Sequence, residues 1–178
     1  MWKNKLSLVT LPFVLLFFLM LEGVLAVYYI GGLISPTFQM AIQLFSTAVF
    51  IIACYVKNVH LVPMILIMGI IYDMYYSPVL SFYTIPLIIV FLFVRYLSQK
   101  VKLTFLTIIG LLSIGNILYN CIVYIEAVVL GLNHTEFLTY LQQKVMPTLF
   151  FNLVLFFVMY IPLVKYINWL NGLVNQKN

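Results

Sequence analysis

The side chains that could do chemistry in this 178-residue chain are few, and only four of them are acidic. An aspartyl protease needs two aspartates that share a proton, but Asp73 is the chain's only aspartate. A hydrolase needs a base beside its nucleophile, yet His60 and His134 fall in segments expected at opposite faces of a membrane. No HExxH motif, glycine-rich phosphate loop or Cys/His cluster with metal-ligand spacing occurs in the sequence. We therefore expect no catalytic residue, no metal site and no cofactor.

The composition is that of a protein whose solvent is lipid. Hydrophobic residues make up 65% of the chain and charged residues 7%, whereas soluble domains are about 45–50% apolar and about 25% charged. The net charge of +5 is spread singly or in short groups between long apolar runs, so no basic patch for nucleic acid is expected. Because backbone polar groups facing lipid must bond within their own helix, we expect an all-α integral membrane protein.

The apolar runs divide the chain into six predicted transmembrane helices within a single membrane domain, residues 1–178. A span needs about 20 apolar residues, and the predicted spans are 6–30, 38–56, 61–76, 79–94, 103–130 and 147–167. The third and fourth are short and form a hairpin around Ser77-Pro78, and residues 131–146 are the only substantial loop expected. Cleavage of the first run as a signal peptide after Ala26 is the alternative, and it would leave five spans.

The basic residues predict the orientation of the chain. If the N-terminus is cytoplasmic, every one of the nine Lys and Arg residues except Lys144 falls on the cytoplasmic side. Cytoplasmic loops carry the excess of Lys and Arg in membrane proteins. We therefore expect a multi-pass protein of the cell membrane with both termini in the cytoplasm.

Polar side chains within the predicted spans fall into one layer. Counted at 1.5 Å per residue, they lie ~18–26 Å from the cytoplasmic ends of their spans or ~8 Å below the outer edge, which places all of them in the outer half. Glu126 is expected to reach the headgroups. The layer either joins helix to helix by hydrogen bonds or lines a cavity for a solute or a partner helix. Its members are Glu22, Gln43, Asp73, Asn116, Asn120 and Asn152.

The two acids of the layer have no cation at their depth. Glu22 and Asp73 are therefore expected either to be protonated or to share a proton. Small residues at 69, 110, 113 and 115 are candidate points of close helix approach, to a partner span or within the bundle itself.

One segment resembles a known family. Residues 69–83, GIIYDMYYSPVLSFY, contain a glycine, two aliphatic residues, an aromatic residue, an aspartate and further aromatic residues, followed by a serine and a closing tyrosine. This pattern, with Gly69, Tyr72, Asp73 and Tyr76, resembles the signature of the bacterial rod shape-determining protein MreD family. The length of the chain, its basic N-terminus and its number of predicted spans are also similar to those of the MreD family. The segment departs from the family at Ser81, where glycine is usual.

The resemblance implies a non-catalytic scaffold of the cell-elongation machinery, which determines rod shape and supports peptidoglycan synthesis. Members of this family are expected to bind MreC and, through it, MreB, RodA and the penicillin-binding transpeptidases. Their fold is similar to that of the substrate-binding subunits of energy-coupling-factor transporters. The alternative function is therefore a small-molecule binding subunit of such a transporter, although the first span lacks the Ala-x-x-x-Ala patch typical of those subunits.

Overall fold

The computed structural model of the chain describes residues 3–33, 39–56, 61–77 and 79–175, and every regular element within these ranges is helical. The predicted all-helical fold is therefore confirmed for this part of the chain. The elements are α1 (Lys3–Leu33), α2 (Leu44–Tyr55), α3 (Leu61–Tyr76), α4 (Thr84–Lys100), α5 (Phe105–Val129), α6 (Phe137–Tyr140), the π-helical turn η1 (Leu141–Val145) and α7 (Met146–Asn175).

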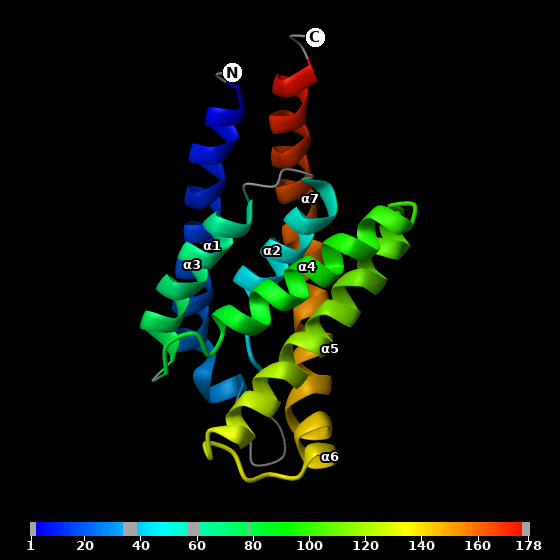
Figure 1. The fold of residues 1–178 in the computed structure, drawn as a ribbon. Helices are drawn as coiled ribbons and strands as arrows, with labels where there is room; N and C mark the ends of the chain where they lie inside the picture. The colour runs from blue at the N-terminus through cyan, green and yellow to red at the C-terminus, as the bar shows by residue number, and fades with distance from the viewer. Residues whose placement is uncertain (1–2, 34–38, 57–60, 78, 176–178) are drawn as a thin grey trace.

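The helices surround α2, which lies at the centre of the bundle (Figure 1). Each residue from Leu44 to Cys54 is buried, and α2 contacts α1, α4, α5 and α7. The start of α1 and the end of α7 lie at one end of the molecule, and the turn between α5 and α6 lies at the other (Figure 1). The bundle is thus built on a helix that the other helices shield from the surroundings.

Among the described residues, three helical stretches are long and apolar enough to cross a membrane: Thr10–Tyr28 in α1, Phe105–Val129 in α5, and Phe137–Trp169, which runs through α6, η1 and α7. Their outward faces are apolar as well: Phe13 and Phe17 on α1 are 67% and 60% exposed, and Phe150 and Val158 on α7 are 69% and 71% exposed. Apolar surface on this scale is typical of a face that meets lipid or a partner rather than water. These features are those of a membrane protein.

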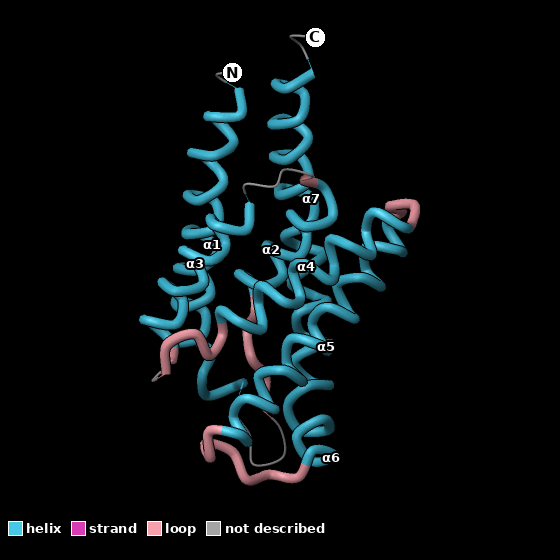
Figure 2. The backbone as a smooth tube through the Cα atoms, in the orientation of Figure 1, coloured by secondary structure: helices cyan, strands magenta, loops and turns pink. Residues whose placement is uncertain are grey.

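The prediction of a continuous helix over residues 38–56 is wrong, because α2 begins only at Leu44. Residues 39–43 are non-helical and are coloured as loop in Figure 2; the stretch runs from an exposed Gln39 to a buried Ile42 and Gln43 before α2. With 12 residues, α2 is ~18 Å long at 1.5 Å per residue. It is therefore too short to span a bilayer core of about 30 Å alone.

Two other predicted boundaries are also wrong. The expected helix 79–94 begins instead at Thr84 and continues to Lys100, because Asp73 binds the backbone where the helix starts. The expected loop 131–146 is helical from Phe137 onwards, so that Lys144 lies in the π-helical turn rather than in a loop. The helix bounds agree closely with expectation at 61–76 and 103–130, where α3 and α5 are found.

Candidate functional site

The amide side chains of the predicted layer meet at the start of α2. Gln43 lies directly before this helix, and its side chain exchanges two hydrogen bonds with that of Asn120: Gln43 Nε2 donates to Asn120 Oδ1 at 3.0 Å, and Asn120 Nδ2 donates to Gln43 Oε1 at 3.2 Å. The same Nδ2 group lies 3.0 Å from Asn116 Oδ1. The backbone N–H of Gln43 donates to Asn152 Oδ1 at 2.8 Å. One network of amides therefore connects α2, α5 and α7.

Side chains of α7 replace the helical hydrogen bonds that residues 39–43 lack. Asn152 Nδ2 donates to the carbonyl oxygen of Ala41 at 2.9 Å, and the N–H of Ala41 donates to Thr148 Oγ1 at 3.1 Å. The N–H of Gln39 donates to the carbonyl oxygen of Gln143 at 2.7 Å. Non-helical backbone at membrane depth is tolerated only where protein satisfies its polar groups. Asn152 and Thr148 thus position the break in the chain before α2.

Glu22 caps the buried helix from α1. Its side chain is 3% exposed, and its Oε2 accepts a hydrogen bond from the backbone N–H of Phe45 at 2.8 Å. Its Oε1 accepts a hydrogen bond from the hydroxyl of Tyr72 at 2.5 Å. A carboxylate beside the first N–H groups of a helix pairs otherwise unsatisfied donors and interacts favourably with the helix dipole. Glu22 therefore connects α1, α2 and α3.

Asp73 has the equivalent role at the start of α4. It is 1% exposed, and its Oδ1 accepts a hydrogen bond from the N–H of Tyr83 at 2.7 Å. Its Oδ2 accepts from the N–H of Thr84 at 3.2 Å and from the Thr84 hydroxyl. Glu22 and Asp73 thus have separate donors, and no hydrogen bond joins the two carboxyl groups in the described part of the chain. Glu22 therefore caps the start of α2, whereas Asp73 caps the start of α4.

Glycine permits a close approach of α3 to α4. A Cβ atom at Gly69 would lie 2.9 Å from both Oγ1 and Cγ2 of Thr84. At Gly115 a Cβ atom would lie 3.0 Å from Val94 Cγ2, whereas at Gly110 it would meet nothing within 4 Å. Gly69 and Gly115 are therefore packed within the bundle, and Gly110 faces outward.

Tyr72 and Tyr76 of α3 pack against α1 and α2. The Tyr72 ring stacks on Phe45 with centroids 5.4 Å apart, and its centroid lies 4.7 Å from that of Tyr76. Tyr76 donates its hydroxyl proton to the carbonyl oxygen of Leu19 at 3.2 Å, and a Cβ atom at Gly23 would collide with this hydroxyl. Tyr72 and Tyr76 therefore bind α3 to α1.

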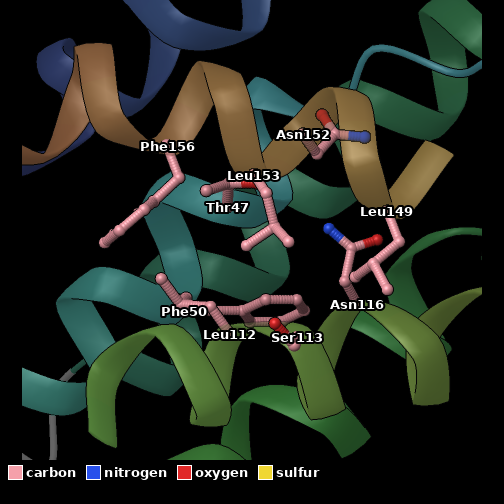
Figure 3. A pocket seen from close by; sticks show the side chains of 9 residues that line it. All are labelled: Thr47, Phe50, Leu112, Ser113, Asn116, Leu149, Asn152, Leu153 and Phe156. Carbon is pink, nitrogen blue, oxygen red and sulfur yellow. The ribbon is translucent and has the colours of Figure 1, made fainter. Parts of the chain in front are cut away.

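A very small cavity lies beside the amide network. Its volume is about 10 Å³, and it lies between α2, α5 and α7, with Asn116 and Asn152 on opposite walls (Figure 3). The hydroxyl of Thr47 lines the cavity and is buried without a hydrogen-bond partner. Small-molecule pockets measure about 300–1,000 Å³, so the cavity is too small for a solute. At this point the polar layer joins helices.

Several residues of the site were not expected from sequence. Three of them are buried threonines within apolar runs: Thr47, Thr84 and Thr148. In the sequence, only a side-chain hydroxyl at the depth of the polar layer distinguishes them from their apolar neighbours. Gly23 gave no signal beyond its small size. Glu126, which the sequence placed near the headgroups, lies close to the end of α5, and its side chain is outside the hydrogen bonds described above.

The described residues contain no group of three or more His, Cys, Asp or Glu side chains that could hold a metal ion. The side chains of Glu22 and Asp73 cap helices, and those of Gln43, Asn120 and Asn152 make hydrogen bonds between helices. Comparison of the chain with protein-family models, curated proteins and solved structures gave no match.

Proposed function

We propose that this chain is a non-catalytic, multi-pass scaffold of the bacterial cell membrane that acts in cell elongation in the manner of the MreD family. The observation that carries the proposal is the joint between α3 and α4, because it gives a structural reason for the residues of the MreD-like segment. Asp73 caps α4 at the N–H groups of Tyr83 and Thr84. Ser81 has a φ of 73°, a left-handed conformation that favours glycine, and glycine is usual in the family at this position.

Gly69 completes the joint. Because a Cβ atom there would lie 2.9 Å from Thr84, a glycine is required for Thr84 to approach α3 while its hydroxyl donates to Asp73. The glycine, the aspartate and the left-handed turn of the segment thus serve one arrangement of two helices. Because these residues act together in the structure, the structure supports the resemblance to the family in addition to the similarity in sequence.

The proposed topology has six helices crossing the membrane with both termini in the cytoplasm. The start of α1, the end of α7 and the turn between α4 and α5 lie toward one end of the bundle (Figure 1). Lys3 begins α1, Lys100 ends α4, and Lys102 lies in the turn that follows. This distribution agrees with the positive-inside rule. Among the proposed spans, α2 would cross as a broken element shielded by its neighbours.

A scaffold acts through a partner, and the proposed partner is MreC, with MreB, RodA and penicillin-binding transpeptidases reached through it. The hydrogen bonds of the polar layer are satisfied largely within the chain, which leaves the apolar outer faces for association. In lipid, helices associate by close packing at small residues. Gly110 is an exposed small residue of this kind on α5.

The experiment is affinity purification of the tagged full-length chain from detergent-solubilised membranes of its host, combined with depletion of the chain in living cells. The proposal expects recovery of MreC and a change from rod-shaped to rounded cells. Recovery of transporter ATPases without MreC, together with vitamin dependence of normally shaped cells, would overturn it.

A transporter binding subunit is the second candidate, and one observation favours it. A pocket of about 430 Å³ opens between α5, η1 and the loop at residues 132–135, and this volume suits a small molecule. Residues of the turn between α5 and α6 line it, and this turn lies at the end of the bundle away from the two termini (Figure 1). The same affinity purification distinguishes this candidate from the scaffold, because each function requires different partners.

A further inference from the structure

The pocket near η1 has walls that the fold holds in place. Tyr124 on α5 donates its hydroxyl proton to the carbonyl oxygen of Thr135 at 2.8 Å, and its ring centroid lies 4.6 Å from that of Tyr140. Tyr140 donates in turn to the carbonyl oxygen of Asn120 at 3.2 Å. The aromatic wall is therefore formed before any ligand arrives, which lowers the entropic cost of binding.

The loop that lines the pocket next to Tyr124 is also fixed by hydrogen bonds. Asn133 Oδ1 accepts from the N–H of Thr135 at 3.0 Å and from its hydroxyl at 2.8 Å. The left-handed turn at Gly131, with a φ of 69°, begins this loop. Asn133 and Thr135 thus line the pocket beside Tyr124.

Lys144 gives the pocket its charge. No acidic side chain is present among the described residues that line the pocket, and Lys144 is the one charged residue there. Its Nζ lies 5.6 Å from the centroid of the Tyr140 ring, and the side chain is half-buried. A partly buried cation without a carboxylate partner is costly, and an anionic ligand offsets that cost.

The backbone at Lys144 is unusual as well. Residues Leu141–Val145 form a π-helical turn between α6 and α7, and single π-helical turns are frequent at functional sites. The carbonyl oxygen of Gln143 in this turn accepts a hydrogen bond from the N–H of Gln39. The turn is thus attached to the segment that precedes α2, and Gln143 and Lys144 both line the pocket.

We propose that this pocket binds a phosphate-bearing anion, either the headgroup of an anionic phospholipid or a soluble phosphate compound. Lys144 supplies the counter-charge, since lysine binds phosphate as a point charge, and the amide of Asn133 offers neutral hydrogen-bond donors to the ligand. Tyr124 and Tyr140 form an apolar wall for the part of the ligand next to the phosphate. The site goes beyond the scaffold function and does not depend on it.

The test compares the wild-type chain with Lys144→Gln, which removes the charge, and Ala127→Phe, which places a ring in the pocket from α5. Lys165→Gln on α7 is the matched control, because Lys165 is exposed and does not line the pocket. Native mass spectrometry of the detergent-solubilised full chain measures retention of phosphatidylglycerol against phosphatidylcholine. A second arm measures thermal unfolding in phosphatidylcholine nanodiscs with inorganic phosphate or chloride at equal ionic strength.

A lipid headgroup is the ligand if the wild type and Lys165→Gln retain phosphatidylglycerol preferentially. Lys144→Gln should then retain it about tenfold less, as loss of a hydrogen bond to a charged group predicts. A soluble phosphate is the ligand if no lipid is preferred but inorganic phosphate raises the unfolding temperature of the wild type and not of Lys144→Gln. Neither effect, or equal effects in Lys144→Gln and Lys165→Gln, would overturn the proposal. Recovery of partner proteins by Lys144→Gln reports on the scaffold function separately.

Discussion

Asp73 Oδ1 lies 2.7 Å from the backbone nitrogen of Tyr83, so a side chain near the end of α3 accepts the hydrogen bond of the residue directly before α4. This contact determines where α4 starts. It also places Thr84 against α3 at the point where Gly69 has no side chain. The residues that join α3 to α4 all lie within residues 69–84. For this reason a short segment of the sequence can resemble the signature of the MreD family.

Replacement of Asp73 tests the joint through stability. Asp73→Asn keeps one acceptor oxygen, and we expect it to lower the free energy of unfolding by about 1 kcal/mol. Asp73→Leu leaves the N–H groups of Tyr83 and Thr84 buried without an acceptor, and we expect a loss of about 3 kcal/mol. Reversible unfolding in mixed detergent micelles measures both. Wild-type stability in Asp73→Leu would show that the cap does not position α4.

Ser81→Gly should stabilise the protein. Ser81 has a φ of 73°, and a left-handed conformation costs a residue with a side chain about 1–2 kcal/mol. After the greater chain entropy of glycine is subtracted, we expect a gain of about 0.5–1 kcal/mol. The same unfolding experiment measures it, with Ser81→Ala as a control that should give no gain. A less stable Ser81→Gly would contradict the proposed turn.

Gly69→Ala should destabilise the bundle by about 1–3 kcal/mol, because the added methyl group would overlap Thr84. Gly110→Ala is the matched control on α5, where a Cβ atom meets nothing within 4 Å. The control should be neutral or slightly stabilising, since alanine favours helix over glycine. Thr84→Ser in the Gly69→Ala background keeps the hydroxyl and removes a methyl group, so it should restore part of the loss. Equal stability of the two alanine variants would argue against the close approach.

Two residues beside the small cavity should respond in opposite ways. Asn152→Leu removes the acceptor of the Gln43 N–H and the donor to Ala41, and we expect a loss of about 2–4 kcal/mol from two unpaired backbone groups. Thr47→Val removes a buried hydroxyl without a partner, and we expect no loss or a gain of up to about 1 kcal/mol. Thermal unfolding in one detergent compares the pair. A Thr47→Val variant as unstable as Asn152→Leu would refute the distinction.

The fold could be predicted in part from the sequence, because apolar runs and turn residues are local signals. The run from Leu61 to Tyr76 has the bounds of α3. The break before α2 was not predictable in this way, since it depends on Asn152, which is 109 residues from Gln43. The start of α4 was missed because a side chain outside that helix, Asp73, supplies the cap.

The candidate site shows the same division. Counting residues from the ends of the predicted spans grouped Gln43 with Asn116, Asn120 and Asn152 in one layer, and hydrogen bonds connect these four side chains or their backbone. The depth of Glu22 in its predicted span did not indicate that it caps a helix. Its partner is the N-terminus of α2, and the sequence had placed the start of that helix at residue 38 instead of Leu44. Local patterns indicate how deep a polar group lies, whereas its partner depends on the packing of distant segments.

The most direct test of the scaffold function is quantitative mass spectrometry of proteins that co-purify with the tagged wild-type chain and with Asp73→Leu from the host's solubilised membranes. The proposed function predicts MreC among the strongest partners of the wild type, and a reduced yield with Asp73→Leu at equal chain abundance. Absence of MreC from the wild-type sample, under conditions that preserve other membrane complexes, would contradict it.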